Sequence, residues 1–193
     1  IKPDAHDEDK HYPINSFAEM VNTEYPKPQF MLDPIIREKT VTQISGDYGS
    51  GKSMTGIQMA VCLSSGLDFI EWKNRTVPRP VLYVEGELPA VDIRERVLEM
   101  TEDLINPNSP EILFRQDNLF ILTLDDLDLA GFKFGFERLA VTNDEDGAAK
   151  GRLLIENTLR EIKERKGQYP VLFLDNISAL CSIDEIKSVD WSG

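Results

Sequence analysis

Eight residues in the first third of the chain carry the clearest chemical pattern. They are Gly46, Asp47, Tyr48, Gly49, Ser50, Gly51, Lys52 and Ser53. The series fits G-x-x-x-x-G-K-[ST], the phosphate-binding loop or Walker A motif. Glycines let successive backbone N–H groups turn toward a polyphosphate, because no Cβ atom stands in the way. Lys52 is placed to reach the β- and γ-phosphates, and the Ser53 hydroxyl to ligate Mg²⁺.

The segments on either side of this loop support the motif. Residues 40–45 (TVTQIS) are rich in β-branched side chains and predict a short buried strand. After the loop, Met54, Ile57 and Val61 recur at helical spacing, and Gly66 stands where a helix C-cap is expected. Strand, glycine loop and helix is the arrangement that the motif needs, because the helix N-terminus points its positive end at the anion.

A second carboxylate pattern lies far along the chain. Residues 171–175 (VLFLD) form an apolar strand that ends in Asp175, the Walker B pattern, which would hold Mg²⁺ through water opposite Ser53. The next residue is Asn176, where one large group of P-loop ATPases carries the glutamate that activates the attacking water. The base must therefore come from elsewhere in this chain.

The end of another predicted strand offers two candidates for that base. Residues 81–84 (VLYV) read as a buried strand that runs directly into Glu85, Gly86 and Glu87. Ligands bind at the carboxyl ends of strands in open α/β sheets, so one of the two glutamates is a candidate base. The alternative is a pair of solvated carboxylates.

The remaining pattern predicts strands that alternate with helices. Helices are expected at 14–21 with Ser16 as N-cap, from Pro89 onward, and at 151–166 with Gly167 as C-cap. Residues 29–32 predict an edge strand, and residues 119–124 a further strand followed by an acidic turn at 125–128. Alternation of this kind indicates βαβ units and an α/β fold with a mostly parallel sheet.

Composition limits the function classes. The chain has 193 residues and a net charge of −13, which argues against a broad surface that coats nucleic acid. No apolar run approaches the length of a membrane span, and the polar first ten residues show no secretory signal. The two cysteines, Cys62 and Cys181, read as buried thiols, so we expect a reducing, cytoplasmic location.

Two further segments leave alternatives open. Residues 67–80 carry a positive cluster with one tryptophan, and they could contact a nucleic acid or another subunit. A loop that packs Trp72 on the domain is the favoured reading. Residues 131–136 alternate glycine and phenylalanine and predict either a hairpin or a hydrophobic plug at a subunit contact.

Taken together, residues 44–53, 78–87 and 174–176 resemble the RecA-like ATPases, in which the catalytic glutamate follows the strand after the Walker A helix. The resemblance is closest to the RepA-like branch of plasmid hexameric replicative helicases and covers about residues 26–182. It places the family glutamate on Glu87, just before Leu88 and Pro89. Leu88 stands where the family usually has an acidic residue, and Glu85 stays as the alternative base.

The resemblance implies a three-layer P-loop NTPase fold with a mostly parallel central sheet. Residues 26–193 would form the ATPase core and residues 1–25 an N-terminal extension. It implies ATP and Mg²⁺ as cofactors, with Lys52 and Glu87 as catalytic residues and Ser53 and Asp175 at the metal. Family members carry one more strand after Walker B, between the Walker B and Walker A strands. Because no such strand is recognisable here, we expect the sheet to be incomplete toward the C-terminus. The first residue, Ile1, and the final Trp-Ser-Gly also suggest a trimmed chain.

The partners implied by the resemblance are further copies of the chain in a ring, perhaps a hexamer, and single-stranded DNA, with no membrane. The work would be unwinding or moving DNA in replication or recombination of a plasmid, phage or mobile element. A P-loop phosphotransferase and a nucleotide-binding regulatory or loader module without hydrolysis stay as alternatives. A GTPase is disfavoured, because the chain contains no N-K-x-D tetrapeptide.

Overall fold

The computed structural model describes residues 14–104, 113–131 and 150–175, and the structural statements below concern these. Residues 132–136 and Cys181 lie outside them. The helices are α1 (Phe17–Val21), α2 (Lys52–Ser65), α3 (Ala90–Thr101), α4 (Leu124–Leu129) and α5 (Lys150–Lys166), with 3₁₀ turns at Glu102–Leu104 and Gln116–Asn118. The strands are β1 (Phe30–Asp33), β2 (Ile36–Arg37), β3 (Lys73–Asn74), β4 (Val81–Glu85), β5 (Leu119–Leu122) and β6 (Val171–Asp175).

The main sheet is parallel and has the order β5-β4-β6. All five residues of the middle strand β4 are buried, as the unbroken apolar sequence predicts for a parallel strand covered on both faces. In register, Val81 pairs with Val171 and Glu85 pairs with Asp175. The strands predicted around 81–84, 119–124 and 171–175 and the parallel sheet are thus confirmed, and the two strands that end in carboxylates are neighbours.

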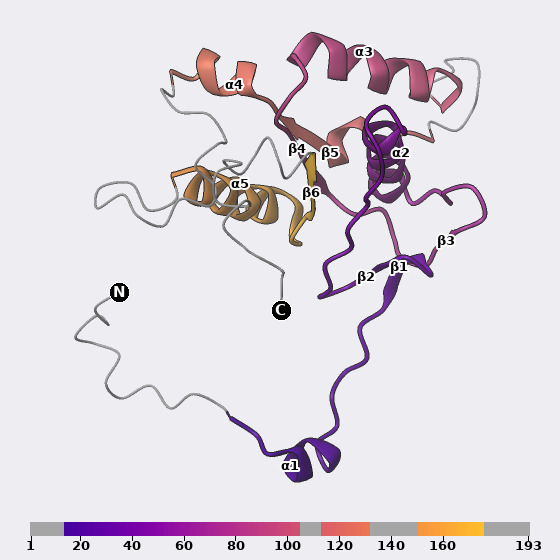
Figure 1. Ribbon diagram of the computed structural model, residues 1–193, viewed down its shortest axis with the longest axis vertical. Helices are drawn as coiled ribbons and strands as arrows, with labels where there is room; N and C mark the ends of the chain where they lie inside the picture. Colours follow the sequence, from indigo (N-terminus) through magenta and orange to yellow (C-terminus); the bar gives the residue numbers. More distant parts are fainter. Residues whose placement is uncertain (1–13, 105–112, 132–149, 176–193) are drawn as a thin grey trace.

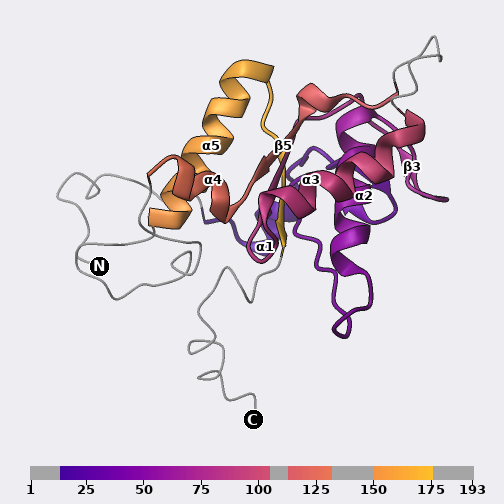
Figure 2. The ribbon, with the colours of Figure 1, turned by 90° about the horizontal axis from the view of Figure 1, so that it is seen from above.

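Helices cover both faces of this sheet (Figures 1 and 2). Val81 and Tyr83 of β4 pack with α2 and α3 in one cluster, whereas Leu82 and Val84 pack with α4 and α5 in the other. This alternation follows from the period of two along a strand, which sends successive side chains to opposite faces. The predicted three-layer α/β fold is therefore present.

Because Leu82 is only 1% exposed in the middle strand, its truncation should strongly destabilise the domain. We expect Leu82→Ala to lower the free energy of unfolding by about 2–5 kcal/mol, from lost transfer energy and the cavity left behind. Urea denaturation followed by circular dichroism measures the change. The matched control is Leu98→Ala on α3, where the side chain is 52% exposed and the cost should be under about 1 kcal/mol.

A second, small sheet lies beside the C-terminal half of α2, with the antiparallel order β2-β1-β3. The prediction of an edge strand at 29–32 is wrong, because β1 is the middle strand and β2 and β3 pair on its two sides. The sequence pattern did not reveal these partners, since each is only two residues long.

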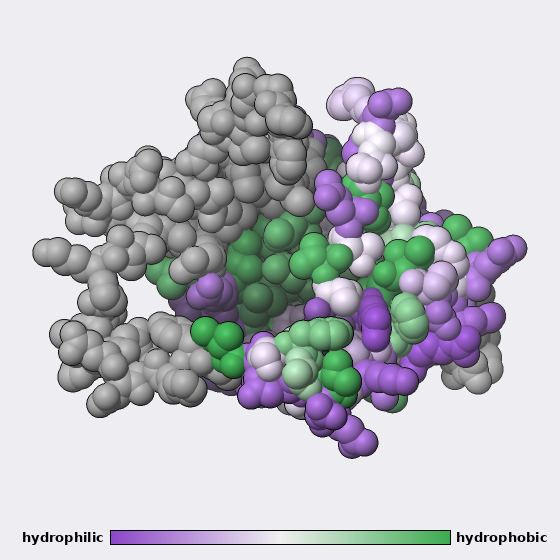
Figure 3. Space-filling view, turned by 60° about the horizontal axis from the view of Figure 1, so that its bottom comes forward, coloured by the Kyte–Doolittle hydropathy of each residue, from purple (hydrophilic) through white to green (hydrophobic). Residues whose placement is uncertain are grey.

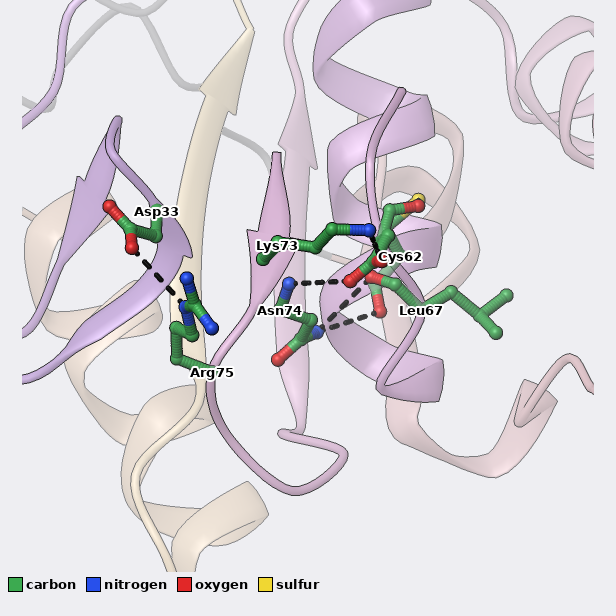
Figure 4. Close-up of polar contacts among 7 residues, drawn as sticks. Asp33, Cys62, Leu67, Lys73, Asn74 and Arg75 are labelled. Atoms are coloured by element: carbon green, nitrogen blue, oxygen red, sulfur yellow. Dashed lines mark hydrogen bonds and ion pairs between the residues drawn. The ribbon is translucent and has the colours of Figure 1, made fainter. Parts of the chain in front are cut away.

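Polar contacts fasten this small sheet to the end of α2 (Figure 4). The Asn74 side-chain amide donates to the carbonyl oxygens of Cys62 and Leu67, at 3.4 and 3.3 Å. Lys73 Nζ lies 2.7 Å from an oxygen of Asp68, which belongs to the turn after α2. Cys62 is buried as predicted, and burial, followed by the Asp68 charge, raises the pKa of its thiol to about 11.

Residues 40–45 do not form the predicted buried strand. They have no strand hydrogen bonds, and the Val41 side chain is 98% exposed. Among the described residues, β6 pairs only with β4, and residues 40–45 make no ladder with its other edge. A strand needs a hydrogen-bonded neighbour, and β-branched sequence alone does not supply one.

Figure 3 shows one face of the molecule, and apolar residues, drawn in green, gather at its centre.

The acidic residues after β5 form a helix where the sequence suggested a turn. Thr123 caps α4, and Asp126 completes a capping box by accepting from the Thr123 backbone N–H. Asp125 accepts a 2.6 Å hydrogen bond from the Ala90 backbone N–H, at the start of α3. This bond matters because Pro89, the N-cap of α3, has no side chain that could cap the helix.

Candidate functional site

The glycine loop, residues 46–53, runs into the first turn of α2. Gly49 and Gly51 have φ values of 76° and 84°, a left-handed conformation that favours glycine. A Cβ atom built on Gly46 would lie 2.8 Å from Ser50 Oγ, so a larger residue there would make the Ser50 hydroxyl move. The predicted pattern of glycines therefore matches what the backbone requires.

The N-terminus of α2 suits an anion. Its N-cap is Gly51, which offers no side chain, so no side-chain oxygen caps the backbone N–H groups of the first turn. Lys52 is the first residue of the helix, and its Nζ donates to the carbonyl oxygens of Gly46 and Asp47, at 2.8 and 2.7 Å. The ammonium group is thus held over the same loop as the helix end, where positive charge and N–H donors attract phosphate.

The carboxyl ends of β4 and β6 bring the predicted carboxylates together. Gly86 N–H donates to the Asp175 carbonyl oxygen at 2.8 Å, which ties the turn after β4 to the end of β6. Asp175 is partly exposed and Glu87 is exposed on this turn. Both side chains therefore have access to water at the edge of the sheet where ligands bind in α/β folds.

Glu85 has a different environment from Glu87. It is 2% exposed, and its Oε1 accepts from the backbone N–H groups of Glu87 and Leu88, at 2.9 and 3.0 Å. Its Oε2 is buried with no hydrogen-bond partner in the described structure. Burial, with smaller contributions from the Asp175 and Glu87 charges, raises the pKa of the Glu85 carboxyl despite the two backbone bonds. Glu85 therefore holds the turn that carries Glu87.

Tyr83 connects the glycine-loop helix to the strand ends. Its hydroxyl lies 2.6 Å from Asp175 Oδ2 and 3.5 Å from the Ser53 carbonyl oxygen. The two residues predicted to hold Mg²⁺, Ser53 and Asp175, thus both lie next to one side-chain oxygen. Hydroxyl and carboxylate oxygens are the ligand types that Mg²⁺ prefers, so these residues fit the ion chemically.

Sequence reasoning identified the strand that contains Tyr83 but assigned no role to that residue. A signal was available, because a tyrosine in a fully buried strand usually finds a hydrogen-bond partner for its hydroxyl. Gly56 in the interior of α2 was a second signal, since glycine is a poor helix former and its presence there needs a packing reason.

The positive cluster of residues 67–80 is paired with carboxylates in the structure. Lys73 pairs with Asp68, and Arg75 Nε lies 3.2 Å from Asp33 Oδ2. Arg79 Nη2 lies 2.5 Å from Glu38 Oε1. The tryptophan of the cluster packs on Phe69, with ring centroids 5.2 Å apart. The favoured interpretation, a loop that packs its tryptophan on the domain, is therefore confirmed.

A pocket of about 340 Å³ lies elsewhere, between α3 and β5. It is mainly apolar, and none of the predicted site residues lines it. Its lining residues are Ala90, Ile93, Arg94, Val97, Leu98, Phe114, Gln116, Leu119, Ile121, Thr123 and Asp126. The chemistry that binds phosphate is at the glycine loop and the strand ends, so we place the candidate site there.

Comparison with known proteins gives one result at the family level. A family model described as an AAA domain matches residues 10–193. No curated protein and no solved structure gives a significant match. In the part of the chain that the structure describes, no helix has both the length and the apolar character needed to cross a bilayer.

Proposed function

Because this chain belongs to the AAA domain family and is a nucleotide-binding P-loop ATPase, we propose that it hydrolyses ATP with Mg²⁺ as a RecA/RepA-like helicase or translocase module. The observation that carries the proposal is the meeting of two elements at one point. The first turn of α2, with Lys52 and Ser53, lies against the carboxyl ends of β4 and β6. This arrangement supports a site in which the glycine loop would bind phosphate and the carboxylates at the strand ends would lie near it.

In this proposal the glycine loop and Lys52 bind the phosphates of ATP. The Ser53 hydroxyl and Asp175 would hold Mg²⁺, which supplies charge neutralisation on the phosphate oxygens when it is bound. Lys52 would exchange its two bonds to the loop carbonyl oxygens for bonds to phosphate. Since the cation already lies over the loop, that exchange needs only a small movement of a flexible side chain.

We assign the base to Glu87. Its side chain is exposed on the turn after β4, whereas the Glu85 carboxyl is buried and bonded to the backbone of that turn. A base must reach the attacking water, and the exposed carboxylate has that access. Glu85 then acts as support for the turn that positions Glu87.

The DNA-related role and the ring rest on the resemblance to plasmid helicases. Action on single-stranded DNA, assembly of copies into a ring and a cytoplasmic location are parts of the proposal. In a ring, ATP would sit at a subunit boundary and a neighbour would supply an arginine. The cations of residues 67–80 are paired with carboxylates, which reduces the net positive charge that this loop offers to DNA.

The test is ATP turnover with and without single-stranded DNA, measured together with the mass in solution. Turnover that DNA stimulates, by a species of several subunits, is the expected result. A monomer that binds ATP–Mg²⁺ and shows no turnover would contradict the motor and favour a regulatory or loader module. Transfer of phosphate to a small acceptor would instead indicate a phosphotransferase.

A further inference from the structure

Tyr83 lies where three elements of the candidate site meet. It belongs to β4, is 2% exposed, and turns its side chain toward α2. Its hydroxyl has one hydrogen atom, and the 2.6 Å distance to Asp175 Oδ2 identifies that carboxylate as the acceptor. The Ser53 carbonyl oxygen, in the first turn of α2, lies 3.5 Å from the same hydroxyl. One buried oxygen therefore links β4, β6 and α2.

The helix makes room for this hydroxyl. A Cβ atom added to Gly56 would lie 3.3 Å from the Tyr83 hydroxyl oxygen and 3.7 Å from a ring carbon. The first distance is shorter than most Cβ contacts in proteins, so the hydroxyl would have to shift by a few tenths of an ångström, and the second is ordinary van der Waals contact. Glycine is a poor residue for a helix interior. Its presence at this position is explained by the space that the tyrosine oxygen occupies.

Packing and a hydrogen bond hold the Tyr83 side chain in place. Its ring is stacked on Phe173 of β6, with centroids 5.8 Å apart and planes 17° apart. The 2.6 Å hydrogen bond from the hydroxyl to Asp175 Oδ2 directs its hydrogen atom toward β6. The stacked ring and this hydrogen bond together hold the side chain in one place.

We propose that Tyr83 is a positioning residue that orients the Asp175 carboxylate relative to the first turn of α2 and so sets the affinity of the site for Mg²⁺. This inference rests on the proposed ATP–Mg²⁺ site. With Oδ2 engaged by the hydroxyl, the carboxylate cannot rotate freely, and its other oxygen stays available to the ion or its water. Groups that hold a metal ligand in this way commonly change metal affinity by about 10- to 100-fold when they are removed.

The direct test is Tyr83→Phe, which removes the hydroxyl and keeps the ring that stacks on Phe173. Binding of a fluorescent ATP analogue is titrated with Mg²⁺, and the Mg²⁺ concentration at half-maximal binding is recorded. We expect that concentration to rise about 10-fold, while nucleotide affinity without Mg²⁺ stays within about 2-fold of the wild type. The matched control is Tyr169→Phe, an exposed tyrosine between α5 and β6, which should change neither value.

A second test does not depend on nucleotide. In the wild-type background, Gly56→Ala should move the hydroxyl away from its place and lower the urea midpoint of unfolding. Combined with Tyr83→Phe, the same alanine meets only two ring carbons, at 3.7 and 4.0 Å, which are ordinary contact distances. It should then raise the midpoint, because alanine favours a helix interior over glycine. A double-mutant cycle gives the coupling between the two positions.

The outcomes separate this inference from the proposed function. A wild-type chain whose nucleotide binding does not respond to Mg²⁺ overturns the proposed ATP–Mg²⁺ site and this inference with it. A wild-type chain that responds, with Tyr83→Phe showing the same Mg²⁺ dependence, overturns the positioning role alone. Two results together support the role. The Mg²⁺ concentration at half-maximal binding should rise about 10-fold in Tyr83→Phe, and the effect of Gly56→Ala on the urea midpoint should change sign when the hydroxyl is absent.

Discussion

Glu87→Gln is expected to bind ATP–Mg²⁺ normally and to lose hydrolysis. Glutamine keeps the size and hydrogen-bonding capacity of the side chain but cannot accept the proton of the attacking water. Removal of a general base typically costs about 10²- to 10⁴-fold in rate. Turnover measured by phosphate release should fall by that factor, whereas the dissociation constant of ATP, measured by titration calorimetry, should stay within about 3-fold.

Glu85→Gln is the matched control for this substitution. The glutamine oxygen can still accept from the backbone N–H groups of Glu87 and Leu88, so the turn should keep its shape. Turnover should stay within several-fold of the wild type. The reverse pattern, with normal hydrolysis in Glu87→Gln and loss in Glu85→Gln, would show that the buried carboxyl is the base and that our assignment is wrong.

The Glu85→Gln variant should also differ from the wild type in how its stability depends on pH. Burial in the folded state raises the pKa of the Glu85 carboxyl above its ordinary value, so the folded protein binds this proton more tightly than the unfolded chain. The Glu85 contribution to stability is therefore more favourable at low pH and is lost as pH rises through the raised pKa. Glutamine has no such titration. The difference in urea midpoint between Glu85→Gln and the wild type should grow in favour of the variant as the pH rises through the raised pKa of Glu85.

The parts of the fold that the sequence predicted well depend on local patterns. The helix α2 follows from its apolar spacing and from Gly66, whose φ of 75° is the left-handed C-cap conformation. Strands β4 and β6 follow from continuous apolar runs, which are typical of parallel strands buried on both faces. Only β4 is buried in this way, because Leu172 and Leu174 of β6 are exposed in the described structure. In each case the residues that specify the element are neighbours in the sequence.

The errors concern features that depend on distant partners. Residues 40–45 have good strand residues, but a strand forms only against a neighbour, and β6 does not pair with them. The role of Tyr83 was missed because its acceptor, Asp175, is 92 residues away in the sequence. Similarly, the acidic residues after β5 cap α3, which begins 35 residues earlier. A linear pattern gives the type of each residue but not which distant residue it meets.

The two halves of the candidate site are built differently. The glycine loop is a continuous stretch of sequence, and the spacing of the motif specifies it. The carboxylate half is brought to the loop by the register that pairs Glu85 with Asp175 and by the hydroxyl that contacts Ser53 and Asp175. The site therefore depends on the sheet for its geometry, and core substitutions in β4 should impair nucleotide chemistry as well as stability.

Lys52→Ala is expected to abolish measurable ATP binding. The ammonium group lies over the loop, at 2.8 and 2.7 Å from two of its carbonyl oxygens, and it is placed to bond phosphate oxygens instead. A charge-assisted hydrogen bond contributes about 1.5–3 kcal/mol. Loss of two such bonds corresponds to an affinity at least about 100-fold weaker. Titration calorimetry with ATP–Mg²⁺ measures the loss.

The matched control is Lys27→Ala, which makes the same change in charge in the extended segment between α1 and β1. It should leave the dissociation constant within about 2-fold, because a distant surface charge acts weakly at physiological salt. Circular dichroism and urea unfolding of Lys52→Ala should match the wild type, since the exposed loop carbonyl oxygens can bond water once the ammonium group is gone. If a folded Lys52→Ala variant bound ATP within 3-fold of the wild type, the phosphates would not lie on the glycine loop, and the proposed site would be wrong.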